Sequence, residues 1–527
     1  MGAYRLKEGG RINRDKKVSF RFNRRRLTGF EGDTIASALL ANDVRQVGRS
    51  FKYHRLRGVM SAGPEEGGAL FNVNDGAMRI ANVKGTMAEL RGDMQVRAQN
   101  AFPSLAFDVG AVNSLFAPFL TAGFYYKTFM WPAKFWEKIY EPIIRHAAGL
   151  GALSGMSDPD CYDKGFLHCD LLIIGAGPAG LAAALTAGRS GARVIIADED
   201  FLPGGRLNAE TIPVGDDAGA EWAAQVAAEL ASMPNVRLMT RTTVIGAFDH
   251  GIYGAVERVT DHLATAPDGT ARQVLWRIYS KRSILCAGSI ERPIAFANND
   301  RPGIMQAGAL RAYANRWAVA AASEVAVFTN NDDGHRTASD LAAKGVKVAA
   351  IIDTRANAPD HGDAEVLAGA CVTDSRGRLG LSKIKVRSAD GSQRWITCGA
   401  LGVSGGWNPN VHLTCHQRGR PVWDDAIAAF VPGAVGPIGL SSAGAASGML
   451  STAAALTGGA AAAVNALGEI GVKAKAMAMP EAEDAPVSIT AFWHVTGKGR
   501  AWLDQQNDVT VKDVKLAHQE NFQSVEH

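Results

Sequence analysis

The stretch His168–Asp200, HCDLLIIGAGPAGLAAALTAGRSGARVIIADED, decides the fold of this chain. Its apolar run Leu171–Ile174 is typical of a buried parallel strand and leads directly into a glycine-rich turn, Gly175–Gly180. The alanine-rich run that follows has the composition of a helix, and Val194–Ala197 predicts a second strand. This order of strand, turn, helix and strand predicts a βαβ unit of the kind that binds dinucleotides.

Each glycine of the turn has a separate predicted task. Gly175 permits the tight turn, Gly177 lets a pyrophosphate approach bare backbone, and Gly180 lets the helix pack closely on the sheet. The helix start directs its amides and the positive end of its dipole at the phosphates. Asp198 follows the second strand, where a carboxylate accepts from ribose hydroxyls and repels a 2′-phosphate. The residues therefore favour FAD or NAD over NADP, and they do not choose between the first two.

Composition limits the classes of protein to consider. The 527 residues allow about two to four domains, and 47% hydrophobic with 20% charged residues is ordinary for a soluble globular protein. A formal net charge of +4 is small for this length, so we expect neither nucleic acid nor a membrane surface as a partner. No clean run of about twenty apolar residues occurs, which argues against a membrane-spanning helix.

The cysteines and the N-terminus indicate the compartment. None of the six cysteines forms a CxxC pair, so a zinc ribbon and a redox disulfide both lack their residues. A secretory signal has an apolar run after its basic start, and the basic N-terminus of this chain is not followed by one. We therefore expect a cytoplasmic protein.

The N-terminal residues predict a β-grasp domain of the ferredoxin kind. An alternating β segment begins at Lys17, and Thr34–Asn42 has helical spacing with a threonine available as the cap. No cysteine lies between Met1 and Asp160, whereas a [2Fe–2S] cluster needs four thiolates. We expect no iron–sulfur cluster in this domain.

A second βαβ unit is predicted further along the chain. It consists of strand Val325–Thr329, helix Thr337–Lys344 and a strand that ends at Asp353. Its turn, Asn330–Gly334, lacks paired glycines and has two carboxylates where phosphates would lie. We expect a nested Rossmann-like domain without a second dinucleotide site, after which Leu401–Ser404 returns the chain to the first domain.

The predicted fold class is α/β: an FAD/NAD(P)-binding Rossmann-like fold of the two-dinucleotide-binding-domain type, with a nested Rossmann-like domain and an N-terminal β-grasp domain. The predicted boundaries are 17–100 for the β-grasp domain, 101–165 for a connector, 166–323 with 400–471 for the dinucleotide-binding domain, 324–399 for the nested domain, and 472–527 for a linker and the start of a truncated C-terminal domain.

The dinucleotide is predicted to contact the first turn, the acids after the second strand and the glycine run that follows them. It is also predicted to contact one later strand, the small residues at the end of another strand, and a later helix start. The candidate residues are Gly175, Ala176, Gly177, Pro178, Ala179, Gly180, Asp198, Glu199, Gly205, Arg206, Leu207, Val244, Ala287, Gly288, Gly444 and Ala445. Two alternatives stay open: Gly204–Leu207 also reads as an ordinary turn, and Gly436–Leu450 as close helix packing. His412–His416 lacks a fourth ligand nearby, so we predict no metal.

The chain resembles the N-terminal half of the alpha subunit of heterotetrameric sarcosine oxidase. Related proteins are subunits of N-methylglutamate dehydrogenase and of dye-linked proline or opine dehydrogenases. Beside the turn at Gly175, the motifs that carry the resemblance are EGDT at Glu31–Thr34, GRSFKYHR at Gly48–Arg55, RPGIM at Arg301–Met305, SGGWNP at Ser404–Pro409 and NDVTVKD at Asn507–Asp513.

The resemblance implies a function for a complex of alpha, beta, gamma and delta subunits. In that family sarcosine is oxidatively demethylated to glycine and formaldehyde, or methylene-tetrahydrofolate, with oxygen reduced to hydrogen peroxide. The secondary amine reacts at FAD on the beta subunit, and FMN lies at the interface between alpha and beta. The alpha subunit holds NAD at the positions that match Gly175, Gly177, Gly180 and Asp198, with FAD as the alternative at that site.

Two departures from the family pattern affect these expectations. Cluster-bearing relatives place thiolates where this chain has Met60–Gly63, which agrees with the branch that lacks the cluster. Family members continue into a folate-binding half that resembles the glycine-cleavage T-protein, whereas this chain ends at His527. We therefore expect a truncated or split subunit. Leu56 and the pair Gly67–Gly68 also differ from the expected family residues.

No residue can be named as a general acid or base, so we expect catalysis only in the complex. Two other hypotheses remain. In the first, the chain is a non-catalytic assembly subunit whose dinucleotide stabilises the fold. In the second, it is a free-standing flavin oxidoreductase with FAD at the first turn.

Overall fold

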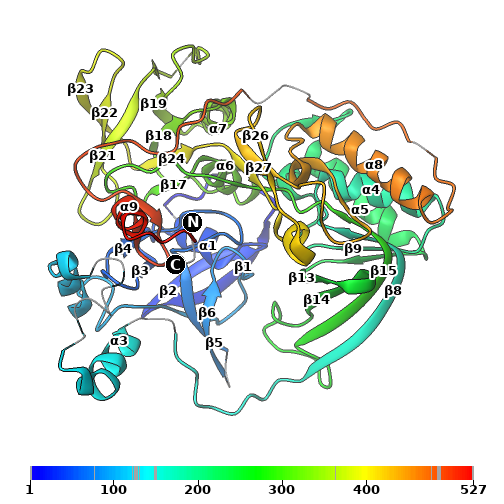
Figure 1. Ribbon diagram of the computed structural model, residues 1–527, viewed down its shortest axis with the longest axis horizontal. Coiled ribbons are helices and arrows are strands. Elements are labelled where there is room, and N and C mark those ends of the chain that lie inside the picture. Colours follow the sequence, from blue (N-terminus) through cyan, green and yellow to red (C-terminus); the bar gives the residue numbers. More distant parts are fainter. Residues whose placement is uncertain are drawn as a thin grey trace.

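The computed structural model describes residues 3–75, 78–120, 123, 129, 131–147, 151–362, 364–475, 477–483 and 488–524 (Figure 1). Parts of the predicted connector and of the predicted C-terminal linker lie outside the described residues. None of the described helices is both long enough and apolar enough to cross a membrane.

The N-terminal domain has a five-stranded sheet in the order β2-β1-β7-β5-β6. Its strands are β1 (Asn13–Phe22), β2 (Arg25–Glu31), β5 (Leu70–Asp75), β6 (Met78–Lys84) and β7 (Gln95–Ala98), with a short pair β3 (Gly48–Arg49) and β4 (Leu56–Arg57) between them. Helix α1 (Ile35–Ala41) begins at Thr34, whose side chain and that of Ser37 form a reciprocal capping box. This arrangement is the ferredoxin-like fold that the sequence predicts.

The first Rossmann-like domain is built on the sheet order β12-β9-β8-β15-β14-β13, and β28 also pairs with β15. The strands are β8 (Tyr162–Ile174), β9 (Val194–Ala197), β12 (Val236–Met239), β13 (Thr242–Phe248), β14 (Ile252–Arg258), β15 (Gln273–Leu285) and β28 (Leu440–Ser442). Helices α4 (Pro178–Arg189), α5 (Gly219–Ser232) and α8 (Thr452–Gly468) bury apolar side chains against it. Small residues let α4 and α8 approach closely, since a Cβ at Gly459 would lie 2.1 Å from the Ala179 carbonyl oxygen.

The nested domain has its own parallel sheet in the order β17-β24-β18-β19-β20. These strands are β17 (Ile304–Gln306), β18 (Glu324–Thr329), β19 (Lys347–Asp353), β20 (Val366–Ala368) and β24 (Ala400–Ser404), with helices α6 (Ala307–Arg316) and α7 (Asp332–Ala343). A three-stranded antiparallel sheet of β21 (Cys371–Arg376), β22 (Lys383–Arg387) and β23 (Gln393–Thr397) is attached. We expected Leu401–Ser404 to rejoin the first sheet, but this strand pairs with β17 and β18, because a short apolar run does not specify its partner strand.

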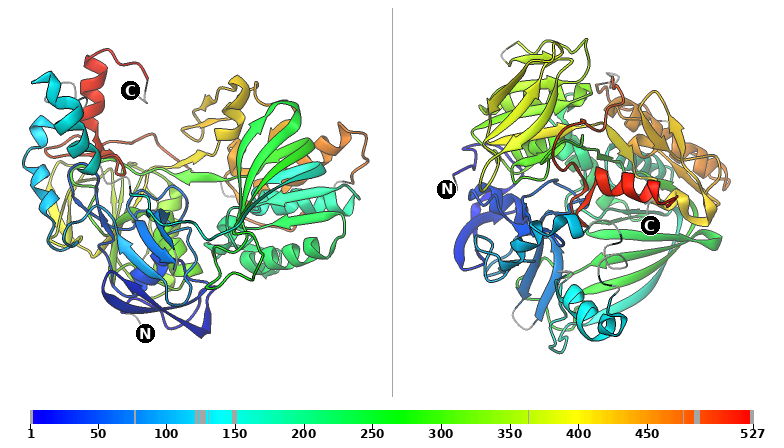
Figure 2. Two further views of the ribbon diagram at one scale, coloured as in Figure 1. Left: turned by 90° about the horizontal axis from the view of Figure 1, so that it is seen from below. Right: turned by 60° about the vertical axis from the view of Figure 1, so that its left-hand side comes forward.

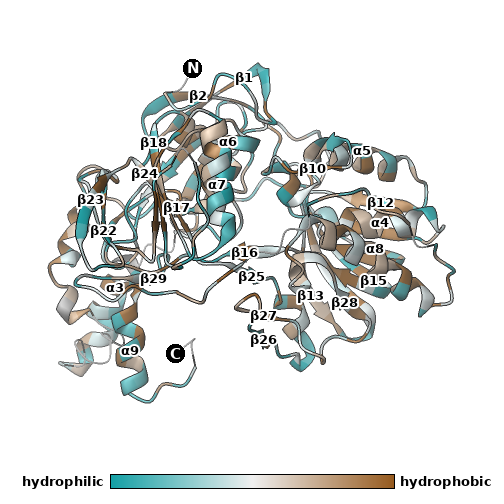
Figure 3. Cartoon of the chain, turned by 90° about the horizontal axis from the view of Figure 1, so that it is seen from above, coloured by the Kyte–Doolittle hydropathy of each residue, from teal (hydrophilic) through white to brown (hydrophobic). Residues whose placement is uncertain are grey.

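Two crossing strands join these units. β16 (Ser289–Glu291) pairs with β25 (Trp407–Pro409), and Figure 3 shows this ribbon between the first Rossmann-like domain and the remaining domains. The hairpin β26 (Val422–Asp424) and β27 (Ala429–Val431) follows β25. At the C-terminal end, β29 (Trp502–Asp504), β30 (Val509–Thr510) and α9 (Val511–Gln519) lie on the same side of the molecule as the N-terminal domain (Figure 2, left), and Trp502 packs against Tyr53. Helix α3 (Glu141–Ala147) lies in the connector.

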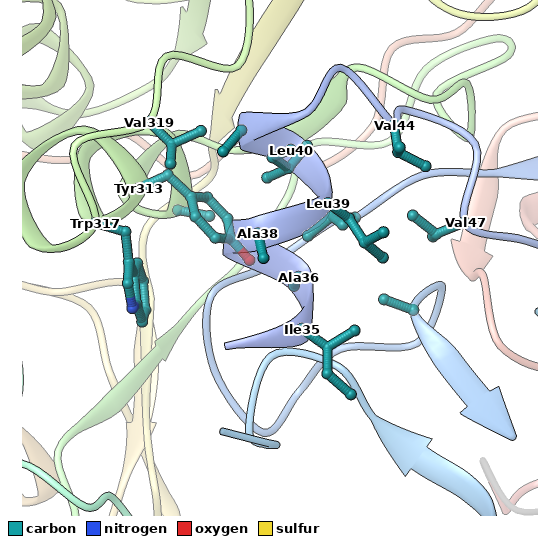
Figure 4. Close-up of a cluster of buried hydrophobic side chains, with 14 of the residues drawn as sticks. Ile35, Ala36, Ala38, Leu39, Leu40, Val44, Val47, Tyr313, Trp317 and Val319 are labelled. Atoms are coloured by element: carbon teal, nitrogen blue, oxygen red, sulfur yellow. The ribbon is translucent and has the colours of Figure 1, made fainter. Parts of the chain in front are cut away.

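The N-terminal domain shares a core with the nested domain. Figure 4 shows Ala38 of α1 next to Tyr313 of α6, with Trp317 nearby, whereas Leu39 points to the other side toward Val47; all of these side chains are buried. Arg5 adds a buried ion pair with Asp33 at 2.6 Å. The ferredoxin-like domain is therefore held against the nested domain by a shared apolar core.

Candidate functional site

The glycines of the first turn occupy three different environments. Gly175 has a φ of +104°, and a Cβ there would lie 2.4 Å from the Cys286 carbonyl oxygen. Gly177 precedes α4, and a Cβ there would meet nothing within 4 Å. A Cβ at Gly180 would lie 1.8 Å from the Gly175 carbonyl oxygen. Tight turning and close packing thus require Gly175 and Gly180, whereas only Gly177 faces open space.

Asp198 lies beside this turn. Its carboxylate accepts the backbone N–H of Ala176 at 2.5 Å and that of Asp200 at 2.8 Å. Burial, together with the nearby Asp200 carboxylate, raises the pKa of Asp198 to about 7. A carboxylate has about four lone-pair sites, so these two bonds leave acceptor capacity for hydroxyl donors.

The two acids after Asp198 differ in their charge partners. Arg316 forms an ion pair with Asp200 at 2.5 Å. Although burial acts in the opposite direction, this guanidinium lowers the pKa of Asp200. Burial raises the pKa of Glu199, and its backbone oxygen accepts from Arg258 at 2.6 Å. The carboxylates therefore lie in a wall that also contains cations.

These groups line a cavity of about 630 Å³, which is within the size range of ligand sites. Of the candidate residues, those that line it are Gly175, Gly177, Pro178, Ala179, Asp198, Glu199, Gly205, Arg206, Val244, Ala287, Gly288 and Ala445. They come from the first turn, the end of β9, the short helix η5 (Gly205–Asn208), β13, the chain after β15 and the short helix η8 (Gly444–Ser447). The structure thus brings together residues spread over most of the Rossmann-like domain.

Four candidate residues lie behind the cavity wall instead. Ala176 is fully buried and donates to Asp198. Gly180 packs on Gly175, and Leu207 belongs to the core under α4. Gly444 has a φ of +66°, and a Cβ there would lie 2.7 Å from that of Ala179. These residues shape the cavity without facing it.

Arg206 contributes a cation to the wall. Its guanidinium forms an ion pair with the buried Glu210 at 2.5 Å and donates to the Leu450 carbonyl oxygen at 2.7 Å. Glu210 raises the pKa of Arg206 against the effect of burial. The nearby Cys286 also lines the cavity, but burial raises the pKa of its thiol to about 12, so it is not a thiolate near neutral pH.

Among the parts of the wall that sequence reasoning missed, two come from segments far from the first turn in the sequence. One is supplied by the ferredoxin-like domain and consists of Thr34, Ala62–Glu65, Thr86 and Met87. The other follows β25 and includes Asn410, His412 and His416. The motif that ends at Pro409 lies beside this second part, whereas no local pattern marks the first part. Among the described residues, no group of three or more acidic, histidine or cysteine side chains is arranged to hold a metal ion.

The corresponding turn of the nested domain is filled by the protein. The Asn331 side chain accepts from Asp333 N at 3.0 Å and donates to Ser404 Oγ at 3.1 Å. Asp332 accepts the Ser488 amide at 2.9 Å, and Thr490 N donates to the Asn330 carbonyl oxygen at 3.1 Å. The chain around residues 488–490 therefore lies across this turn.

The acid at the end of β19 is also occupied by protein groups. Asp353 is fully buried and accepts from His335 Nε2 at 2.8 Å and from Arg355 Nη2 at 2.7 Å. Despite the burial, these two partners lower the pKa of Asp353. This carboxylate is the positional counterpart of Asp198.

Comparisons with known proteins agree with this organisation. Residues 15–101 match the family described as 2Fe-2S iron-sulfur cluster binding domain, 170–243 match FAD dependent oxidoreductase, and 498–527 match Sarcosine oxidase A3 domain. The sarcosine oxidase subunit alpha of Rhizobium meliloti (strain 1021) is 47% identical over 100% of this chain and 54% of that protein. The chain is homologous to sarcosine oxidase alpha subunits.

A second alpha subunit, from Corynebacterium sp. (strain U-96), is 37% identical over 98% of this chain and 51% of its own length. The chain thus spans about half the length of these curated relatives. The solved L-proline dehydrogenase from P. horikoshii has the same fold, with a TM-score of 0.66, 18% identity, and coverage of 99% of this chain and 88% of that one.

The predicted fold class is confirmed: a ferredoxin-like domain precedes an FAD/NAD(P)-binding Rossmann-like region of the flavoprotein type. Residues 170–243 are thus similar to FAD-dependent oxidoreductases, and the whole chain is similar to sarcosine oxidase alpha subunits. Although residues 15–101 match a cluster-binding family, this segment contains no cysteine to supply thiolates.

Proposed function

We propose that the cavity binds the adenosine diphosphate part of one dinucleotide. The observation that carries this proposal is the pairing of an open glycine, Gly177, with a carboxylate, Asp198, on the wall of one cavity. The pyrophosphate would lie over Gly177 at the N-terminus of α4, where amides and the helix dipole favour negative charge. Asp198 would accept from the adenosine ribose, and the side chain of Arg206 would add a positive charge to the same wall.

Two dinucleotides, FAD and NAD, are candidates for this site. The match of residues 170–243 to FAD-dependent oxidoreductases supports FAD, whereas the family resemblance implies NAD. Both present the same adenosine and pyrophosphate to the first turn. A bound flavin would supply two-electron redox chemistry in this cavity.

Releasing the nucleotide by denaturation tests this assignment. We expect about one equivalent of a dinucleotide in the supernatant, identified by mass, with absorbance near 450 nm only if it is a flavin. Release of a mononucleotide, or of no nucleotide from protein incubated with excess FAD or NAD, would contradict the proposal.

For the whole complex, we propose oxidative demethylation of a secondary amine, with sarcosine as substrate. Sarcosine, oxygen and water would give glycine, formaldehyde and hydrogen peroxide, the amine losing two electrons that oxygen gains. The amine would react at FAD on a beta subunit, with FMN at the interface and gamma and delta subunits completing the assembly. Homology to sarcosine oxidase alpha subunits supports this proposal.

Exposed apolar side chains support docking to other subunits. Trp131 is 84% exposed, Leu115 79% and Phe102 75%, and all three belong to the segment between the ferredoxin-like and Rossmann-like domains. Co-expression with beta and gamma chains should give one species on gel filtration. Separate monomers would contradict the assembly without affecting nucleotide binding.

A structural role for the dinucleotide is the second candidate. The cavity wall comes from both the Rossmann-like and the ferredoxin-like domain, so a ligand there would hold the two together. In that case, removing the nucleotide would lower the melting temperature and leave the turnover of the complex unchanged.

A further inference from the structure

A loop of the ferredoxin-like domain forms part of the cavity wall. It runs between β4 and β5, and its residues Ala62–Glu65 line the cavity together with Thr86 and Met87. Asp198 and Glu199, which are expected to lie at the adenosine ribose, line the same cavity. The loop therefore brings a residue from outside the Rossmann-like domain to the nucleotide.

The loop is held in one conformation by a buried carboxylate. Glu66 is fully buried, and its two oxygens accept four backbone amides. The donors, with their distances, are Met60 at 2.9 Å, Ser61 at 2.8 Å, Gly68 at 2.6 Å and Ala69 at 3.0 Å. A carboxylate that satisfies this many amides fixes the backbone on both sides of Glu65.

Two further bonds fix the loop relative to its surroundings. The Tyr313 hydroxyl of α6 donates to the Ser61 carbonyl oxygen at 2.9 Å, and Thr86 Oγ1 donates to the Gly63 carbonyl oxygen at 2.8 Å. Tyr313 belongs to the buried core that the ferredoxin-like and nested domains share. Glu65 is therefore presented to the cavity by a rigid scaffold rather than by a free loop.

The charges that act most strongly on Glu65 are those of two other carboxylates, Glu66 and Glu199. Asp198 and Glu199 line the same cavity, and burial together with Glu66 and Glu199 raises the pKa of Glu65. Of the nearby cations, Arg316 pairs with the Asp200 carboxylate, whereas Arg258 donates to the neutral carbonyl oxygens of Glu199 and Met87 and so keeps its positive charge. Lys84 donates to the Pro64 carbonyl oxygen. A further negative group placed beside Glu65 would thus meet repulsion.

We propose that Glu65 is a specificity-determining residue that, with Asp198, rejects nucleotides carrying a 2′-phosphate. This inference rests on the proposed adenosine site. Ribose hydroxyls can donate to carboxylates, whereas a 2′-phosphate brings about two negative charges to the same position. The ferredoxin-like domain, which has no cysteines to hold a cluster, would then contribute to ligand selection.

Calorimetry with ADP-ribose and 2′-phospho-ADP-ribose on the full chain tests the inference. Both probes reach the adenosine end whether the natural ligand is FAD or NAD. In Glu65→Gln, the affinity for the 2′-phosphorylated probe should rise about tenfold, as expected for removing one close like charge, with little change for ADP-ribose. The gain should shrink as salt is added.

Glu31→Gln is the matched control, because Glu31 is a half-exposed carboxylate on β2 of the same domain and does not line the cavity. Glu65→Gln removes the charge and keeps a side chain that can form hydrogen bonds, whereas Glu65→Ala removes both, so comparing the two variants separates these effects. Both variants should keep the melting temperature of the wild type. An unchanged ratio of the two affinities in both Glu65 variants would overturn the inference while leaving the adenosine site intact. Failure of ADP-ribose to bind the wild-type chain would overturn the site and the inference together.

Discussion

Two βαβ units in this chain share a topology and differ in their turns. After β8, the turn contains bare glycine backbone that faces a cavity, and the acid after β9 has acceptor capacity to spare. After β18, asparagine and aspartate side chains bond to the turn itself, and the acid at the end of β19 is held by His335 and Arg355. A Rossmann-like unit therefore becomes a candidate nucleotide site only when its turn leaves backbone amides and a carboxylate accessible.

The comparison also assigns different purposes to two carboxylates in equivalent positions. Burial raises the pKa of Asp198, as expected for an acid without a cationic partner. The partners His335 and Arg355 instead lower the pKa of Asp353. We therefore expect Asp198 to bind a ligand and Asp353 to stabilise the fold.

The largest expected effect is that of Asp353→Asn. Removing the charge would leave His335 without its carboxylate partner and Arg355 with the more exposed Asp332 as its acidic partner, which should cost about 3 kcal/mol in the free energy of unfolding. Nucleotide affinity should stay unchanged. Chemical denaturation and calorimetry measure the two quantities, with the exposed Asp390→Asn as control. A loss of nucleotide affinity in the folded variant would remove the contrast between the units.

The next largest effect should come from replacing with alanine the tightly packed glycine in the first turn of α4 and of α7, Gly180 and Gly334. A Cβ at Gly180 would meet the Gly175 carbonyl oxygen, and one at Gly334 would lie 2.4 Å from Thr329 Oγ1. Each substitution should destabilise the fold by about 1–3 kcal/mol. Only Gly180→Ala should also weaken nucleotide binding, because it displaces Gly175. Equal binding by both variants would argue against a site at the first turn.

Gly177→Ala should separate ligand binding from folding. Nothing lies within 4 Å of the added Cβ, so the free energy of unfolding should change by less than about 0.5 kcal/mol. The methyl group would hold the pyrophosphate off the backbone, weakening dinucleotide affinity by at least about tenfold, or about 1.4 kcal/mol. Gly468→Ala, another glycine with open space but outside the cavity, is the control. Unchanged affinity in Gly177→Ala would contradict the proposed pyrophosphate position.

The smallest effect concerns pH. Because burial raises the pKa of Asp198 to about 7, its stabilising contribution is present below about pH 4 and is lost as pH rises through about 7. Asp353 has a lowered pKa, so its contribution is present near neutral pH and is lost in acid. Melting curves of the unliganded protein should therefore show a flatter profile between pH 4 and 7 for Asp198→Asn than for wild type. The same slope in both proteins would argue against the raised pKa.

The sequence was sufficient to predict the fold class, because the order of strand, glycine turn, helix, strand and acid is local. It also predicted part of the cavity wall within the Rossmann-like domain, including Gly177 and Asp198. That these residues bind a nucleotide stays a prediction.

Contacts between distant segments could not be predicted in the same way. Glu65 reaches the cavity only because the ferredoxin-like domain packs on α6, and nothing in its local sequence indicates that packing. Leu401–Ser404 shows the same limit, since the short apolar strand β24 that contains it fits either sheet. Likewise, no local signal indicates that residues 488–490 lie across the nested turn.

The most direct test is to count nucleotides per chain. Wild-type protein and its Gly177→Ala and Asp353→Asn variants would be incubated with excess FAD or NAD, freed of unbound ligand by gel filtration, denatured and assayed by mass and absorbance. The account predicts about one dinucleotide per chain in the wild type and in Asp353→Asn, and close to none in Gly177→Ala. Two per chain, or full retention by Gly177→Ala, would contradict it.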